Sequence, residues 1–203
     1  MQKLLKFSRL VDTVTSKLGS LIIWLILGST VISAANAIVR KAFDNSSNAF
    51  LEIQWYLFSA SFLLAAGYTL FNGEHVKIDL IYNRWSKRAR MWIDVFGFTV
   101  FLTPVCLAVL YFSLPFFWQA FRSGEVSGNA GGLIRWPVYL MLPLGFTLLL
   151  LQGWSELIKR LAFLKGLIDD PTLKKGEKTA EEELAEVIRQ REAEAAAAAA
   201  AKN

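Results

Sequence analysis

The chain has 203 residues, of which 54% are hydrophobic and 19% are charged, and its formal net charge is +5. Soluble domains average roughly 45–50% apolar and about 25% charged residues, so both fractions favour a membrane protein. The single cysteine, Cys106, and the single histidine, His75, exclude an internal disulfide, a cysteine-based metal cluster and a bis-histidine haem site within one chain.

The charge is unevenly distributed along the sequence. Residues 1–165 contain 16 Lys and Arg against 8 Asp and Glu, a balance of +8, whereas residues 166–203 contain 6 against 9, a balance of −3. A basic chain often indicates a nucleic-acid partner, but most of these cations flank apolar segments, so we expect none. The division predicts a transmembrane domain at residues 1–165 and a cytoplasmic, acidic, Ala-rich tail at residues 166–203.

Four segments are long and apolar enough to cross a bilayer, which takes about 20 helical residues. None carries a charge near its middle. Backbone in lipid must satisfy its own hydrogen bonds, so each segment is predicted to be an α-helix. Trp and Tyr gather at the ends of the segments, as they do at membrane interfaces. The chain is therefore predicted to be an all-α membrane protein with four spans, at residues 18–39, 53–71, 91–121 and 136–157.

Prolines and one serine predict local features of these helices. Pro104 and Pro115 should kink the long third span, and Pro143 should kink the fourth. Pro137 falls in the first turn of the fourth helix, where its missing N–H costs little. Ser86 is suited to cap the start of the third helix.

The positions of Lys and Arg predict the orientation. Twelve lie in the N-terminal segment, in the loop between the second and third spans, and directly after the fourth span. The other two loops contain only Arg40, Lys41, Arg122 and Arg135. We therefore expect both termini and the 72–90 loop to be cytoplasmic, and the 40–52 and 122–135 loops to face outward.

Three segments outside the spans have distinct compositions. The 74–90 loop mixes basic and apolar residues, which is typical of a short helix at the inner interface. The 123–135 loop is rich in Gly and small residues, which favours tight turns, although it could also bind a partner. Residues 179–201 have high helix propensity, and Thr179 with Glu182 fits a capping box, so a charged, Ala-rich helix is expected there.

The sequence offers little for catalysis or for an intramembrane ion pathway. Glu52, Asp94 and Glu156 all lie within about one turn of a predicted span end rather than at the midplane. His75 and Asp79 would share a helix face, but without a third positioned group a local polar contact is favoured over a catalytic dyad. We therefore expect no enzyme activity and no catalytic, cofactor-binding or metal-binding residue in this chain.

Four stretches together resemble the DctQ family, the small membrane subunits of tripartite ATP-independent periplasmic (TRAP) transporters. In that family an acidic residue opens the second helix, and a Gly-x-His-x-x-x-Asp-like element follows it, here Gly73, His75 and Asp79. The last stretch resembles the subgroup often labelled mannitol/chloroaromatic-type. The stretches are EIQWYLF at 52–58, GYTLFNGEHVKIDL at 67–80, RWSKRARMW at 84–92 and EVSGNAGGLIRWPVYLMLPLGF at 125–146.

The resemblance implies a Na⁺-coupled uptake system of the bacterial inner membrane that imports an organic acid. A periplasmic binding protein would capture the solute, and a large elevator subunit would hold the solute and Na⁺ sites. The small subunit would pack on the large one as a scaffold and help dock the binding protein. The alternative is a membrane anchor for a respiratory or quinone-reactive enzyme, which the single histidine disfavours.

These expectations assign two groups of candidate site residues. The first group would contact the large subunit or the lipid bilayer: Glu52, Trp55, His75, Asp79, Arg84 and Arg88. The second group would help dock the periplasmic binding protein: Arg40, Lys41, Glu125, Asn129 and Arg135.

Overall fold

The computed structural model describes residues 1–43, 47–73 and 85–171. The chain divides into two compact units, Met1–Leu167 and Ile168–Asn203, and all the helices named below belong to the first. Most of the described residues are helical, and four helical segments are long and apolar enough to cross a membrane. The predicted all-α fold with four spans is therefore confirmed. The predicted interfacial helix lies mostly, and the Ala-rich tail helix wholly, outside the described residues.

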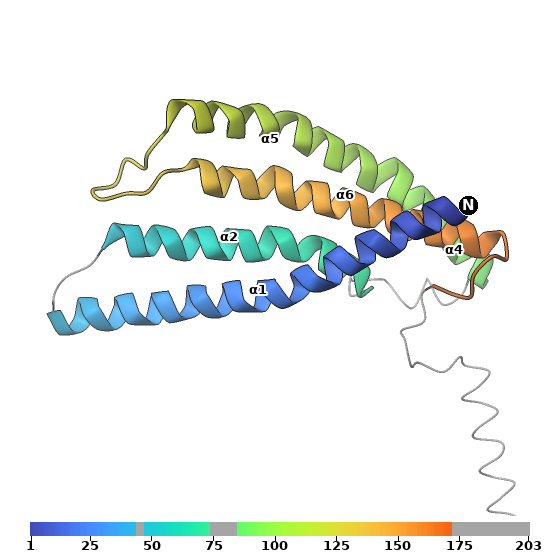
Figure 1. The fold of residues 1–203 in the computed structure, drawn as a ribbon, viewed down its shortest axis with the longest axis horizontal. Helices are drawn as coiled ribbons and strands as arrows, with labels where there is room; N and C mark the ends of the chain where they lie inside the picture. Colours follow the sequence, from blue (N-terminus) through green and yellow to red (C-terminus); the bar gives the residue numbers. More distant parts are fainter. Residues whose placement is uncertain (44–46, 74–84, 172–203) are drawn as a thin grey trace, which may run out of the picture. The chain divides into compact units, whose positions relative to one another are not determined.

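The helices pack in the order α1, α2, α6, α5 (Figure 1). α1 runs over Gln2–Phe43, α2 over Asn48–Phe71 and α6 over Trp136–Leu164. α6 contacts α1, α2, α4 and α5, so the other helices assemble around it. α1 lies beside α2 for much of its length, and near its N-terminus it crosses towards α6 and contacts that helix as well (Figure 1).

α1 begins well before the first predicted span. Its first turns are amphipathic, and Ser8, Val11 and Thr15 form a buried stripe at helical spacing. The stripe continues with Gly19 and Ile22 into the apolar part of the helix. The helix therefore extends past the apolar segment, because one face of the preceding turns is buried against the rest of the protein.

The third span is one continuous helical segment, Lys87–Ser123, with a change of geometry inside it. It comprises α4 (Lys87–Phe96), a π-helical segment η1 (Gly97–Leu102) and α5 (Thr103–Ser123). The Ser86 side chain accepts a hydrogen bond from the Ala89 N–H, which confirms the predicted cap. The π segment ends at Leu102, two residues before Pro104, which has no backbone N–H for a regular α-helical hydrogen bond. The wide turn is where the chain accommodates that proline.

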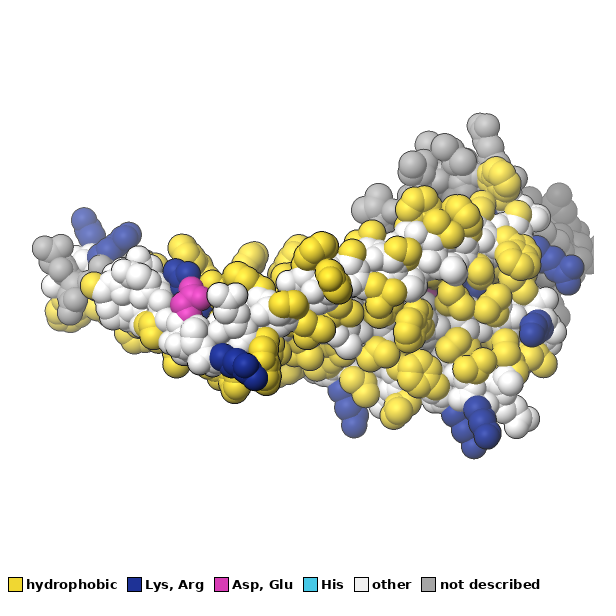
Figure 2. Space-filling view, turned by 90° about the horizontal axis from the view of Figure 1, so that it is seen from above, with side chains coloured by type: hydrophobic (Ala, Val, Ile, Leu, Met, Phe, Trp, Pro, Cys, Tyr) yellow, Lys and Arg dark blue, Asp and Glu magenta, His cyan; other side chains and the backbone are white. Residues whose placement is uncertain are grey.

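Large apolar side chains cover much of the molecular face in Figure 2. On α5, Val105, Tyr111, Phe112, Leu114 and Phe116 are all at least half exposed. A soluble protein would not expose so much apolar surface, whereas in a bilayer this surface contacts lipid or another membrane subunit.

Gly145 allows the closest approach between α2 and α6. A Cβ atom at this position would lie 2.7 Å from the Leu63 carbonyl oxygen of α2, which is backbone and cannot rotate away. At Gly67, on the same helix pair, a Cβ would lie 3.5 Å from the Leu148 backbone, an ordinary van der Waals contact. The glycine at 145 is therefore required by packing, and the one at 67 is not.

Replacing Gly145 with alanine should force α2 and α6 apart. Overpacking of this kind typically lowers the free energy of unfolding by about 1–3 kcal/mol. We expect a lower midpoint of thermal unfolding in detergent for Gly145→Ala, followed by circular dichroism. Gly67→Ala is the matched control and should unfold near the wild-type temperature. Equal midpoints for the two variants would contradict this account of the α2–α6 contact.

Candidate functional site

Two clusters of polar side chains lie between the helices, at opposite ends of the membrane domain. The first is here named the α6 cluster and joins α1 and α4 to α6. The second, the loop cluster, joins α2 to the segment 124–135. The α6 cluster comprises Ser8, Asp12 and Thr15 of α1, Asp94 of α4, and Gln152, Ser155, Glu156, Lys159 and Arg160 of α6.

Gln152 links α1 to α6 at the buried side of the α6 cluster. Its side chain is fully buried, and its Oε1 accepts a hydrogen bond from Thr15 Oγ1 at 2.8 Å. Its Nε2 donates to Asp12 Oδ1 at 3.0 Å and to Glu156 Oε1 at 3.3 Å. Ser155 Oγ also donates to Asp12 Oδ1, at 2.9 Å. A single carboxylate on α1 is thus held by several donors from α6.

The charged members of the α6 cluster form a chain of ion pairs in which each acid binds a cation. Arg160 Nε donates to Asp94 Oδ2 at 2.7 Å, and its Nη1 donates to Glu156 Oε2 at 2.5 Å. Lys159 pairs with Asp12 at 3.1 Å and also with Glu156. The Arg160 guanidinium further lies over the Phe98 ring, 4.8 Å from its centroid, in the π segment. The paired charges therefore fasten α1 and α4 to α6.

The sequence does not reveal this cluster as a unit. Lys159 and Arg160 follow the predicted fourth span and count there as orientation signals, and Asp12 precedes the predicted first span. A signal was present, because Gln152, Glu156 and Arg160 recur every fourth residue and so share one helix face. In the described part of the chain, no group of three or more His, Cys, Asp or Glu side chains is arranged to hold a metal ion.

Three side chains spaced four residues apart on α2 hold the loop cluster together. Asn48 Nδ2 donates to the Ala130 carbonyl at 3.0 Å, and the Tyr56 hydroxyl donates to the Ile134 carbonyl at 3.0 Å. Between them lies Glu52, which is only 5% exposed. The row of side chains lies along the 124–135 loop and holds it from the turn at Ala130 to Ile134 near its base.

The Glu52 carboxylate accepts three hydrogen bonds from the loop. The donors are Ser127 Oγ at 2.5 Å, Asn129 Nδ2 at 2.9 Å and the Leu133 backbone N–H at 2.7 Å. Hydrogen bonds to an ionised carboxylate are stronger than neutral ones, and a buried carboxylate needs them. Glu52 therefore determines the conformation of the loop.

The loop itself is hairpin-like, with two short arms joined by a turn. Gly124, at φ 61°, ends α5 in the left-handed region that favours glycine. Val126 and Ile134 then form an antiparallel bridge, supported by the Ser127 N–H bond to the Leu133 carbonyl at 2.9 Å. The tight-turn prediction for this segment agrees with this geometry.

An ion pair lies at the base of the loop and faces solvent. Arg135 Nη1 lies 2.9 Å from Glu125 Oε1, and the two side chains are 39% and 41% exposed. Arg135 also donates to the Tyr139 hydroxyl at 3.4 Å, and this bond is the main cause that raises the pKa of Arg135, with Glu125 adding to it. The loop thus presents one fixed cation and one fixed anion side by side.

A comparison with protein families matches residues 29–163 to the family described as tripartite ATP-independent periplasmic transporters, DctQ component. The chain belongs to the DctQ family. The match covers all of the loop cluster and the α4 and α6 parts of the α6 cluster. No curated protein matches the sequence.

The chain is therefore a small membrane subunit of a TRAP transporter, and a transporter component rather than an enzyme. TRAP systems are tripartite, with a DctQ component, a large DctM subunit and a periplasmic binding protein. The alternative of a respiratory or quinone-reactive membrane anchor gains no support from the family match. The mannitol/chloroaromatic-type subgroup stays a prediction.

The DctQ subunit brings together residues that the sequence assigned to different roles. Glu52, expected to contact the large subunit or lipid, accepts a hydrogen bond from Asn129, expected at the docking surface. Trp55 and Arg88 are exposed. The exposed Arg40 and Lys41 form the last turn of α1, and Glu125 and Arg135 pair with each other. His75, Asp79 and Arg84 lie outside the described residues.

Replacing Glu52 with glutamine should release the loop. The amide can accept only through one oxygen, so at least one of the Ser127, Asn129 and Leu133 donors loses its partner, at about 1–3 kcal/mol. Amide hydrogen exchange in the 124–135 peptide should therefore become about 10- to 100-fold faster, measured by mass spectrometry. Glu125→Gln removes a carboxylate from the same loop, but its exposed ion pair contributes only about 0–1 kcal/mol. Equal exchange in the two variants would show that Glu52 does not hold the loop.

Replacing Arg160 with methionine should destabilise the subunit strongly, because Asp94 and Glu156 would lose their shared cation. Removing one partner of a buried ion pair typically lowers stability by about 3–5 kcal/mol. We expect a lower midpoint of thermal unfolding in detergent, and partial recovery when Asp94→Asn is added. Lys165→Met, at an exposed position of the same helix end, is the control. A double variant less stable than Arg160→Met alone would contradict the pairing.

Proposed function

We propose that this DctQ subunit is the fixed scaffold of a Na⁺-coupled, binding-protein-dependent importer of an organic acid in the bacterial inner membrane. It packs on the large elevator subunit and helps dock the periplasmic binding protein. The solute site and the Na⁺ sites belong to the large subunit. The family match supports the general role, and the ion pairing within the α6 cluster suits a part that does not move.

The observation that carries the docking role is the preformed loop at 124–135. α2 holds it through Asn48, Glu52 and Tyr56, so the exposed pair of Glu125 and Arg135 has a defined position. A preordered surface loses less conformational entropy on binding than a flexible one. Arg40 and Lys41 add positive charge at the same end, because α1 ends there and α2 begins beside the loop.

The orientation is part of the proposal. The twelve-to-four distribution of Lys and Arg supports cytoplasmic termini, which places the loop cluster on the periplasmic side and the α6 cluster near the cytoplasmic side. In this arrangement the loop faces the compartment of the binding protein. The exposed faces of α1 and α5 remain available to the large subunit and to lipid. So do the exposed side chains of Trp55 on α2 and Arg88 on α4. His75, Asp79 and Arg84 are proposed to make further contacts of this kind.

Reconstitution of the transporter tests the proposal. The solute is chosen first, as the organic acid that raises the unfolding temperature of the binding protein most. The binding protein loaded with this acid is then added to proteoliposomes that contain the large subunit and carry a Na⁺ gradient. We expect uptake only when this chain is included. Glu125→Ala with Arg135→Ala should raise the binding-protein concentration needed for half-maximal uptake by about tenfold and leave the maximal rate unchanged.

Lys165→Ala, an exposed cation at the opposite end, serves as the control and should not change that concentration. Undiminished uptake without this chain would overturn the scaffold role. An unchanged half-maximal concentration in the Glu125 and Arg135 double variant would overturn the docking role and leave the scaffold role standing.

A further inference from the structure

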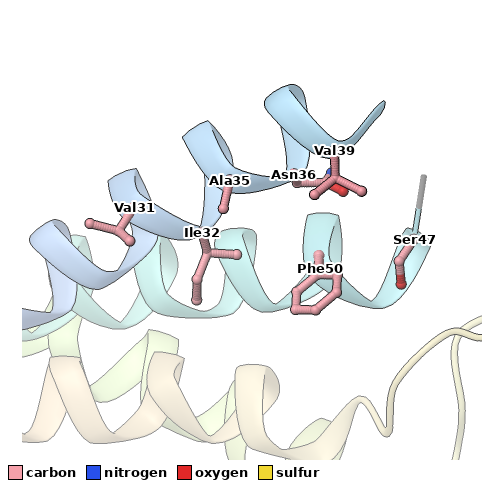
Figure 3. Close-up of a pocket in the computed structure, with 7 residues that line it drawn as sticks. All are labelled: Val31, Ile32, Ala35, Asn36, Val39, Ser47 and Phe50. Atoms are coloured by element: carbon pink, nitrogen blue, oxygen red, sulfur yellow. The ribbon is translucent and has the colours of Figure 1, made fainter. Parts of the chain in front are cut away.

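A groove lies between α1 and the start of α2, and its lining residues belong to neither polar cluster (Figure 3). Its volume is about 240 Å³. Most of its lining is apolar, and five of its residues come from consecutive turns of α1. The lining from α1 is Val31, Ile32, Ala35, Asn36 and Val39, and Phe50 of α2 lies opposite. Val39 and Phe50 remain about half exposed, so the groove opens on the outer surface of the helix pair.

The groove changes from apolar to polar along its length. The part around Val31 and Ile32, away from the α1–α2 connection, has only hydrocarbon side chains, whereas Asn36 and Ser47 line the part near that connection. Arg40 follows Ile32 and Asn36 in the same every-fourth-residue row of α1. Arg40 does not itself line the groove, but helical side chains lean towards the N-terminus, so we expect its side chain over the turn that carries Asn36. The polar end of the groove therefore has a cation beside it.

This arrangement matches an amphipathic molecule with one apolar chain and an anionic head. Along the groove, hydrocarbon side chains are followed by polar ones, the order in which an acyl chain and a head group follow one another in a lipid. In the segment 40–47 two cations, Arg40 and Lys41, outnumber one acid, Asp44, which favours a negatively charged head group. The order of the lining and the local charge thus favour a phospholipid with an anionic head.

We propose that the groove binds one anionic phospholipid of the adjacent leaflet. One acyl chain lies along Val31, Ile32 and Ala35, and the phosphate is bound by Arg40 near Asn36 and Ser47. The proposal goes beyond the scaffold and docking roles. It shares Arg40 with the proposed docking surface, but lipid binding is measured on this chain alone, so its outcome does not depend on docking or on transport.

Native mass spectrometry of the full chain in detergent tests the site. The chain is titrated with phosphatidylglycerol and, separately, with phosphatidylcholine of the same acyl chains. We expect phosphatidylglycerol to be retained about fivefold or more tightly. Arg40→Ala should abolish this preference. Lys41→Ala is the matched control, since it removes the same charge at the same depth from a row of α1 that does not line the groove.

A second pair of variants tests the acyl-chain part of the groove. Ala35→Phe fills the groove and leaves its charges in place, so it should reduce retention of both lipids. Val31→Phe fills the apolar end and replaces Ala35→Phe if that variant unfolds at a lower temperature than the wild type. Unchanged lipid retention in the filled variants would overturn the proposal.

Three other results would also overturn the proposal. Equal retention of the two lipids by the wild type would show no preference for an anionic head group. Equal losses in Arg40→Ala and Lys41→Ala would indicate only diffuse charge attraction. Efficient cross-linking of a photoreactive group at residue 35 to the large subunit in membranes would make a protein side chain the occupant.

Discussion

The carboxylates buried between helices are the constraint on which this structure depends. An ionised group away from water is stable only when it is paired and hydrogen-bonded. The protein meets this requirement twice by placing polar side chains every fourth residue along one helix. On α6 the row of Gln152, Glu156 and Arg160 binds α1 and α4. On α2 the row that contains Glu52 binds the 124–135 loop.

The two rows act at opposite ends of a closely packed helix pair. Gly145 lets the backbones of α2 and α6 meet between the rows, and the carbonyl of Leu63 occupies the space that a side chain would need. Association of helices in lipid depends on such close packing and on polar contacts rather than on the hydrophobic effect. Consequently α2 and α6 form the central pair of the domain, and α1 and α5 keep large apolar faces exposed.

Features that depend on local sequence could be predicted, and features that join distant segments could not. Hydropathy predicted the four spans, and Ser86 and Pro137 predicted helix starts, because each depends on a few neighbouring residues. Asp12 and Gln152 meet across 140 positions, and Glu52 and Asn129 across 77, which a single sequence does not report. In the sequence, Lys159 and Arg160 count as orientation signals because they follow the fourth span. Their role as partners of buried acids is therefore not evident from the sequence. The π segment before Pro104 was missed since a proline alone predicts only a kink.

A scaffold and a moving element place opposite demands on buried charges. A moving element must exchange partners or expose charges to water as it moves, and each exposed or unpaired state carries a large penalty in lipid. In the α6 cluster, Asp12 of α1 and Asp94 of α4 each bind a cation of α6, and separating α1 or α4 from α6 would break these pairs. At the other end, Glu52 holds the loop through hydrogen bonds from three neutral donors. The arrangement of charge therefore supports the proposed role of this subunit as a part that stays rigid.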